Sequence, residues 1–401
     1  MLRHTLILSD VHLTTLVRDR TDGWLAYRRP ELAPDELLAR VIAQAHAEAR
    51  KQYAFFELVF AGDLFDLDAP PECGEATRAS YVGCRTDVGA EACMRRALAD
   101  HPSFSAAVAR VLADGTSRVI FVPGNHDAQL AFLGVRKAIV EAFAAESLPG
   151  RVRFRSWFHR TPDKRIIVEH GHQYDPLCMM QRMFARVSPD GTAVLEDTVG
   201  TVGTHFGQAL FGLLNPYATD PFEFAAGGMG MLRACIGRAV SDLRQSAAAL
   251  SAFREMTLVR PEDPTAVDLD DWLAFIVHET GSPRAKLERH RALWAPKADA
   301  SVLTHAVAGT ADYGQEVSAR LSSAMDAIAD IHTGTRAVVT GHTHEPFVYS
   351  DRAGRRFFAN AGSWTPPVKP DQPVGTFVTI ADDSGGLAGA LRTVWPDGSI
   401  T

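Results

Sequence analysis

The sequence predicts an α/β fold in which two mixed β-sheets pack face to face as a sandwich with helices outside, together with a large helical insertion. Three observations predict it. Short apolar runs typical of buried strands alternate with helical periodicity over residues 1–175. Residues 176–332 have a mostly helical pattern, and strand patterns return between 337 and 395. A strand-rich core interrupted by a helical module is the simplest organisation for that order.

The amino-terminal part contributes the first strands. A buried run at 4–10 ends in polar residues, the spacing of apolar residues in 33–51 is that of an amphipathic helix, and 55–63 is a second buried run. An irregular segment follows at about 68–90, and a helical pattern then continues through Leu112. Further strands fit 117–127, 152–157 and 165–172, with a helix over 128–147.

Strands return near the carboxy terminus, at 337–344, 355–364, 376–381 and 389–395. The sequence DDSGG between the last two predicts a hairpin turn. We therefore expect residues 1–175 and 333–401 to form a catalytic core, and 176–332 to form a mainly helical insertion that acts as a lid or a substrate-specificity module.

Composition excludes several classes of protein. The 401 residues are 46% hydrophobic and 22% charged, which rules out disorder, collagen-like repeats and a disulfide-stapled mini-protein. The net charge of −7 provides no general positive field for nucleic acid, so such binding would need a local patch. No run of about 18 apolar residues predicts a membrane span. The first apolar run is too short for a signal peptide, and we expect a cytoplasmic protein with its five cysteines reduced, although a Cys73–Cys84 disulfide is an alternative.

Residue types that bind metals follow five of the predicted strands. They occur as Asp10-x-His12, Gly62-Asp63-x-x-Asp66, Gly124-Asn125-His126-Asp127, His170-Gly171-His172 and Gly341-His342-Thr343-His344. Each motif alone is weak, since Asp66 fits a helix cap and paired histidines also occur in cores. In open α/β sheets, however, loops beyond the carboxyl ends of the strands converge. We therefore expect the five motifs to meet in one site.

The mixture of Asp, Asn and His side chains indicates which chemistry that site performs. Imidazole and carboxylate ligands together suit divalent transition metals such as Mn, Fe, Zn, Co or Ni. Two such ions about 3.5–4 Å apart can clamp the attacking and leaving oxygens of a phosphoester. The sequence therefore predicts a binuclear metal centre whose substrate is a phosphoester.

These motifs resemble the signature of the calcineurin-like metallophosphoesterase superfamily, over about residues 1–175 and 333–370. The resemblance implies that Asp10, His12 and His344 bind one metal, that Asn125, His170 and His342 bind the other, and that Asp63 bridges them. It implies that His126, oriented by Asp66, is a general acid or a transition-state stabiliser for the leaving oxygen, and that a metal-bridging hydroxide is the nucleophile. His172 is an alternative to His170. By the resemblance the protein is a hydrolase of phosphomonoesters or phosphodiesters, a phosphatase for which manganese is one candidate metal.

Departures from the family pattern limit the choice of subfamily. Leu67 stands where Ser/Thr protein phosphatases carry Arg, which speaks against a phosphoprotein phosphatase. UDP-2,3-diacylglucosamine hydrolases share several motifs but commonly have Arg at the position of His126, and they are much shorter. A pyrophosphatase of that kind is one alternative, and a catalytically inactive scaffold and a nuclease are others. No ligand of the signature is absent, which argues against the scaffold.

Three other segments have open readings. Residues 360–364 (NAGSW) could present backbone amides or Trp364 to a substrate, or could be a strand-end turn with a packed Trp. A basic cluster could bind a second phosphate or could be a solvated helix face: Arg284, Lys286, Arg289, His290, Arg291 and Lys297. The apolar segment 204–235 could be a core, a lid, or a surface for peripheral membrane or lipid contact.

Overall fold

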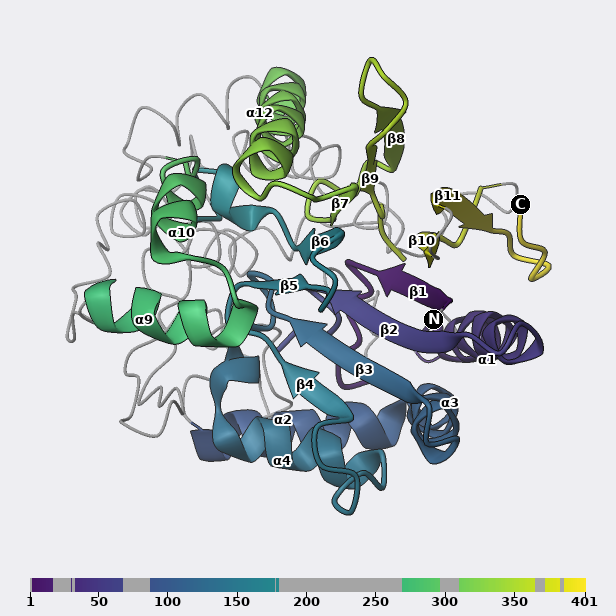
Figure 1. Cartoon of the computed structure of the whole chain (residues 1–401). Helices are drawn as coiled ribbons and strands as arrows, with labels where there is room; N and C mark the ends of the chain where they lie inside the picture. Colours follow the sequence, from purple (N-terminus) through teal and green to yellow (C-terminus); the bar gives the residue numbers. More distant parts are fainter. Residues whose placement is uncertain are drawn as a thin grey trace, which may run out of the picture.

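A computed structural model describes residues 2–16, 30, 33–67, 87–176, 178–179, 269–295, 310–364, 372–382 and 386–401. It contains two mixed sheets that face each other, with helices outside both (Figure 1). The predicted fold class is therefore confirmed.

The first sheet has six strands in the order β11-β10-β1-β2-β3-β4. Its four parallel members are β1 (Arg3–Leu8), β2 (Phe55–Ala61), β3 (Ser117–Val122) and β4 (Val152–Phe154). The antiparallel hairpin of β10 (Gly375–Asp382) and β11 (Leu387–Val394) extends the sheet beyond β1, as the turn sequence predicts. The central strands are apolar on both faces because both faces are covered.

The second sheet has five strands in the order β5-β6-β7-β9-β8. Its parallel members are β6 (Ile166–Glu169), β7 (Ala337–Thr340) and β9 (Phe357–Asn360), and antiparallel β5 (Phe158–Arg160) and β8 (Phe347–Ser350) form the edges. Between the sheets lies a layer of small and β-branched side chains that includes Val59, Ile120, Val168 and Val339. This layer joins strands that lie far apart in the sequence.

Helices complete the two outer layers (Figure 1). To the right of the first sheet and below it in this view lie α1 (Asp35–Lys51), α2 (Asp87–Asp100), α3 (Pro102–Ala113) and α4 (Leu133–Ala142). On the other side lie α9 (Leu269–Thr280), α10 (Arg284–Arg291) and α12 (Thr310–Ile331). α12 packs against β7, and α9 packs against β5. The helices described within 176–332 therefore cover the second sheet directly.

Several elements differ from the sequence expectation. The helical pattern that ends at Leu112 is two helices, because Pro102 starts α3 and the Asp35 carboxylate accepts bonds from the N–H groups of Ser103 and Phe104. The helix expected at 128–147 is a 3-10 turn (Ala128–Ala131) followed by the shorter α4. The short edge strands β5 and β8 were not predicted.

The expectation of reduced thiols is wrong at Cys93 in α2, which is disulfide-bonded, whereas Cys178 is free and half-buried. No helix in the described part of the chain is long and apolar enough to cross a membrane. Cys73, Cys84, Cys235, Lys297 and the apolar segment 204–235 lie outside the described residues.

Candidate metal centre

The predicted site residues lie just beyond the carboxyl ends of β1, β2, β3, β6 and β7. Adjacent loops are linked by backbone hydrogen bonds: the Asp10 N–H donates to Gly62 O (3.2 Å), the His12 N–H to Asp63 O (3.0 Å) and the Gly341 N–H to His170 O (2.9 Å). Within each sheet these bonds hold neighbouring loops together, and His170 Nε2, 3.1 Å from Asp63 Oδ2, joins the loops of one sheet to those of the other.

The backbone of this edge is strained at the predicted ligands. Of the eight non-glycine residues with positive φ in the described ranges, five belong to the predicted metal set: Asp10 (52°), His12 (54°), Asp63 (49°), His342 (74°) and His344 (59°). Left-handed backbone is unfavourable for residues that carry a Cβ, and it concentrates at functional sites. It also ends the strands earlier than the sequence predicts, so β7 stops at Thr340 rather than at 344.

Glycines make room for the ligands at two places. A Cβ on Gly124 would lie 2.5 Å from the Asp63 backbone nitrogen and would overlap the Asp63 carboxylate. A Cβ on Gly341 would overlap Ser9 Oγ and Asp10 Oδ2. The absence of a side chain at these two positions allows neighbouring loops to approach closely.

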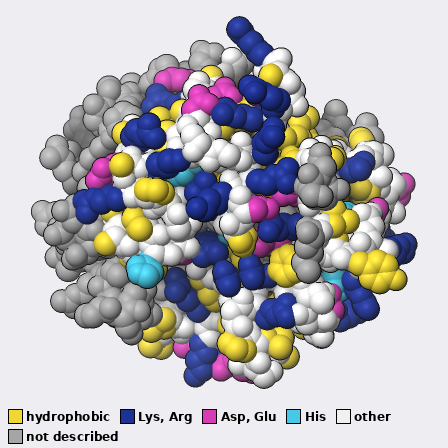
Figure 2. Space-filling view, in the orientation of Figure 1, with side chains coloured by type: hydrophobic (Ala, Val, Ile, Leu, Met, Phe, Trp, Pro, Cys, Tyr) yellow, Lys and Arg dark blue, Asp and Glu magenta, His cyan; other side chains and the backbone are white. Residues whose placement is uncertain are grey.

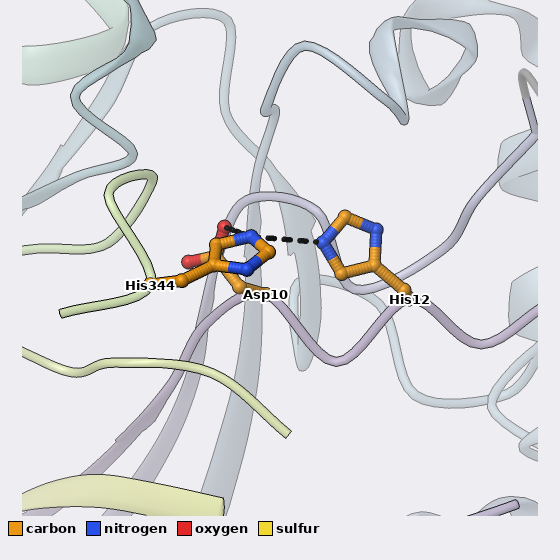
Figure 3. A group of neighbouring side chains, drawn as sticks. All are labelled: Asp10, His12 and His344. Atoms are coloured by element: carbon orange, nitrogen blue, oxygen red, sulfur yellow. Dashed lines mark hydrogen bonds and ion pairs between the residues drawn. The ribbon is translucent and has the colours of Figure 1, made fainter. Parts of the chain in front are cut away.

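Asp10, His12 and His344 form one group of potential ligands (Figure 3). The ring of His344 points toward both partners: its Nε2 lies 3.2 Å from Asp10 Oδ1 and 3.3 Å from His12 Nε2. Burial favours the protonated form of Asp10, but nearby His170 and His344 outweigh it and lower the pKa of Asp10 to about 2. Burial and the charge of His126 lower the pKa of His12 to about 4, so His12 is a neutral imidazole with a lone pair to donate.

Asp63, Asn125 and His170 meet beside this group. His170 Nδ1 lies 2.9 Å from Ala61 O, a carbonyl that only accepts, so Nδ1 is the donor. Its Nε2 lies 3.1 Å from Asp63 Oδ2, 3.1 Å from Asn125 Oδ1 and 4.0 Å from Asp10 Oδ1. A neutral imidazole would present a lone pair to these three oxygens, so the arrangement requires a positive charge at that point.

Either a proton or a metal ion can supply that charge. Burial disfavours the imidazolium, but the Asp63 and Asp10 carboxylates outweigh it and raise the pKa of His170 to about 9. Burial likewise opposes ionisation of Asp63, whereas His170 and His126 hold its pKa well below the usual range. A buried set of two carboxylates, an amide oxygen and imidazole nitrogens fits a divalent transition metal. The residues present therefore fit the metal centre expected from the sequence.

His126 lies beside Asp63 and His12, and its side chain is more exposed to solvent than that of Asp63. Its backbone N–H donates to Asp63 Oδ1 (2.8 Å), and its ring centroid is 5.0 Å from that of His12. Nδ1 lies 3.5 Å from Asp66 Oδ1, and the side chain is 31% exposed. An imidazole that faces a carboxylate with one nitrogen and reaches solvent with its ring can exchange a proton with a bound molecule.

His342 is the one predicted ligand whose ring nitrogen does not join the others. Its backbone N–H donates to Asp10 Oδ2 (2.9 Å), but its Nε2 lies 3.1 Å from Asp175 Oδ2, in a separate group with Cys178. His172 also belongs to none of the ligand groups found among the described residues. The strand β6 ends at Glu169, and Gly171 (φ 107°) separates His172 from His170, so the two histidines do not lie on one strand.

Two functional residues have roles that the motifs do not reveal. The buried Asp127 carboxylate accepts bonds from the N–H groups of Gly124 (2.6 Å) and Leu64 (3.0 Å) and so fixes two ligand loops to each other. Burial and neighbouring Asp63 raise its pKa to about 7. The buried Asn360 amide donates to Gly341 O (2.6 Å) and to Thr343 Oγ1 (3.1 Å), which shapes the His342–His344 loop. Asp127 was visible in the motif, but only the fold identifies its partners.

The remaining candidates, segment 360–364 and the basic cluster, have structural rather than substrate-binding contacts in the described residues. Trp364 is buried, and its backbone N–H donates to Asp10 O (3.0 Å), which is the packed-Trp reading of 360–364. In the basic cluster, His290 is fully buried beside Tyr174 Oη (3.1 Å), whereas Arg284 pairs on the surface with Glu288 (2.9 Å). The part of the cluster within α10 is therefore a solvated helix face with one buried histidine.

The chain has little sequence identity with the solved structures that it resembles. These include a dimetal phosphatase from Danio rerio (10% identity, 97% of this chain and 98% of that chain, TM-score 0.33) and TT1561 of Thermus thermophilus (10%, 97% and 99%, 0.29). A third is the sulfate thiohydrolase SoxB from Thermus thermophilus (12%, 98% and 56%, 0.31). No match is found among curated protein sequences.

The family comparison is more informative, because its model matches half of the chain. The model described as calcineurin-like phosphoesterase matches residues 3–207, a range that contains the first four of the five motifs. The chain belongs to the calcineurin-like phosphoesterase family.

Proposed function

We propose that this protein is a two-metal phosphoesterase that hydrolyses a phosphomonoester or phosphodiester. The observation that carries the proposal is the environment of His170 Nε2, which faces oxygens of Asp63, Asn125 and Asp10 with no donor among them. In this proposal Asp10, His12 and His344 hold one ion, Asn125, His170 and His342 hold the other, and Asp63 bridges them. The ions supply Lewis acidity that neutralises charge on the phosphoester oxygens.

The protein's own residues have separate tasks in the proposed reaction. His126 donates a proton to the leaving oxygen, and its 31% exposed ring supports that contact with a substrate. Asp66 Oδ1 faces His126 Nδ1 at 3.5 Å, and its negative charge would favour a proton on that nitrogen and so leave Nε2 to face the leaving group. The Asp63 carboxylate, fixed by the N–H of His126, keeps the acid beside the metal ligands.

The test is a metal analysis of the full chain beside hydrolysis of p-nitrophenyl phosphate and of its bis-ester with added Mn²⁺. We expect about two ions per chain, no turnover for Asp63→Ala, and a loss of about 10²–10⁴-fold for His126→Ala. His4→Ala, which removes a surface histidine bonded to Gln52, is the matched control. The preferred ester separates a monoesterase from a diesterase. Less than one ion and no turnover in the wild type would favour the inactive scaffold.

A nuclease is less well supported. Figure 2 shows many Lys and Arg side chains on the face seen in Figure 1. Burial, together with the charges of Arg153, Arg151 and Arg3, lowers the pKa of Arg118, so these four guanidinium groups are close to one another. Arg3 and Arg118 stand at the amino-terminal ends of β1 and β3, whereas the metal ligands follow the carboxyl ends of the strands. These two arginines are thus at the opposite ends of their strands from the site, where they could not hold a nucleic-acid backbone against it.

We also propose that residues 176–332 are the module that sets substrate preference, since α9, α10 and α12 within it are helical and line the second sheet. The cytoplasmic location, the metal identity and a substrate like that of the UDP-2,3-diacylglucosamine hydrolases stay predictions. Hydrolysis of a nucleoside diphosphate lipid, beside the two nitrophenyl esters, would test the last of these.

A further inference from the structure

Asp175 is a carboxylate beside the metal centre that no motif of the family signature contains. It follows the short 3-10 turn His172–Tyr174, and only 7% of its surface is exposed. Asp175 Oδ2 lies 3.1 Å from His342 Nε2, and Oδ1 accepts a 2.5 Å hydrogen bond from the Tyr313 hydroxyl. The two oxygens thus have separate partners from separate parts of the chain.

These contacts determine the protonation of the His342 ring. An ionised carboxylate can only accept hydrogen bonds, and so His342 Nε2 must carry the hydrogen. The lone pair is then on Nδ1. In His170 the opposite arrangement would hold with an ion bound, because Nδ1 donates to Ala61 O and Nε2 is the nitrogen left for the ion. A histidine that binds a metal is commonly fixed in this way by a carboxylate or carbonyl on its other nitrogen.

Tyr313 connects this arrangement to α12. The side chain is 7% exposed and stands in the first turns of that helix, which packs against β7. His342 follows β7 by two residues. Tyr313 also lies outside the residues that the family model matches. The helical region therefore contributes a contact to the site, and does so by way of Asp175.

We propose that Asp175, held by Tyr313, is a positioning residue that fixes His342 in the Nε2–H tautomer so that Nδ1 is the nitrogen that binds metal. The inference rests on the proposed two-metal function, because it assigns His342 to an ion. Asp175 itself contacts neither ion nor substrate in this proposal. Asp175 affects the affinity for only one of the two ions, because only one of the two ligand sets includes His342.

A series of variants of the full chain tests the proposal by equilibrium dialysis against Mn²⁺, without reference to turnover. Asp175→Ala should weaken one of the two ions by about 10- to 100-fold and leave the other unchanged. Asp175→Asn should recover part of that loss, because its amide oxygen still accepts from His342 Nε2. Tyr313→Phe should give a smaller loss of affinity for the same ion, because the Asp175 carboxylate stays in place but loses one hydrogen-bond donor.

Two controls separate positioning from other roles. Tyr349→Phe removes a hydroxyl that bonds to Ser322 O on the same helix (3.1 Å) and should bind both ions as the wild type does. Cys178→Ser should also bind both ions. It tests the alternative that Asp175, Cys178 and His342 hold an ion themselves. A third ion in the wild type that both Asp175→Ala and Cys178→Ser remove would overturn the proposal. So would wild-type affinity for both ions in Asp175→Ala and Tyr313→Phe.

Failure of the proposed function gives a different result. A wild type that binds two ions but hydrolyses no phosphoester would refute the proposed activity, yet the affinity series would still decide the role of Asp175. Should Asp175→Ala not fold, Asp175→Asn and Tyr313→Phe carry the same comparison, because both keep the size of the original side chain.

Discussion

Replacing Gly124 with Ala should disable the metal centre while the fold is retained. The new Cβ would lie 2.5 Å from the backbone nitrogen of Asp63 and 2.8 Å from its Cγ, whereas ordinary van der Waals contact begins at 3.4 Å. The Asp63 backbone would therefore have to move by about 0.9 Å, the difference between 3.4 and 2.5 Å. A misplacement of about 1 Å at a reacting centre costs about 10²-fold in rate.

The carboxylate cannot escape this displacement by rotating, because its Oδ1 is bonded to the His126 N–H at 2.8 Å and its Oδ2 faces His170 Nε2 at 3.1 Å. We therefore expect Gly124→Ala to bind less metal and to hydrolyse p-nitrophenyl phosphate about 100-fold more slowly at saturating Mn²⁺. A factor of 100 corresponds to about 2.7 kcal/mol of barrier. Metal content, initial rates and a urea melt on the same preparation measure the three quantities involved.

The matched control is Gly314→Ala in α12, where a Cβ would meet nothing within 4 Å and φ is not positive. It should keep wild-type activity and gain up to about 1 kcal/mol of stability from better helix propensity. Two bound ions and a rate within threefold of the wild type in Gly124→Ala would refute the reasoning, since Asp63 would then tolerate the displacement.

Three further predictions concern stability. Burial raises the pKa of Glu279 from 4.5 to about 7, so the folded protein keeps a proton that the unfolded chain loses, and stability falls as pH rises from about 4.5 to 7. Glu279→Gln removes that dependence, so in urea melts the difference between its free energy of unfolding and that of the wild type should shift by about 2–3 kcal/mol in favour of the variant between pH 4.5 and 7. Free energies that change with pH in parallel in the two proteins would contradict the assignment. Asn360→Ala leaves Gly341 O and Gly362 N without their buried partner and should cost about 2–4 kcal/mol, whereas a cost below about 1 kcal/mol would mean that water replaces the amide. With chelator present, His344→Gly should be about 1 kcal/mol more stable than His344→Ala because φ is 59° at this position, whereas Ala319→Gly on α12 should cost about 1 kcal/mol. If glycine changed the free energy of unfolding relative to alanine in the same direction at both positions, backbone strain at His344 would be ruled out.

Much of the fold was predictable because its central strands are buried on both faces. Each of the strands β1, β2 and β3 contains a short apolar run, interrupted in β2 by Glu57 alone, that is followed by polar residues. The edge strands β5 and β8 escaped prediction, since β5 is three residues long and the exposure of β8 alternates over only four. Such short segments carry too little periodicity to be recognised.

The site was predictable as a set of residues but not as a set of contacts. Strand ends with Asp, Asn and His are visible in the sequence, whereas the bond from Leu64 N–H to Asp127, across 63 residues, depends on the sheet order. The pairing of His342 with Asp175, across 167 residues, likewise depends on where β6 and β7 lie. Tyr313 carries no local signal at all, because its partner is fixed only when α12 packs on the second sheet.

Five of the proposed ligands have a left-handed backbone conformation that the contacts between distant segments maintain. Each of Asp10, His12, Asp63, His342 and His344 has a left-handed backbone conformation, which costs a residue with a Cβ about 1–2 kcal/mol, although Asp and His adopt it more often than most residues do. The ligand segments restrain one another instead: the His342 N–H donates to the Asp10 carboxylate, and the His12 N–H donates to Asp63 O. Asp10 and His342, and likewise His12 and Asp63, are therefore bonded to each other, so neither member of these two pairs can relax alone. The proposed metal ligands are therefore held in place by the fold itself, and the free energy for this comes from the buried strands on which they stand.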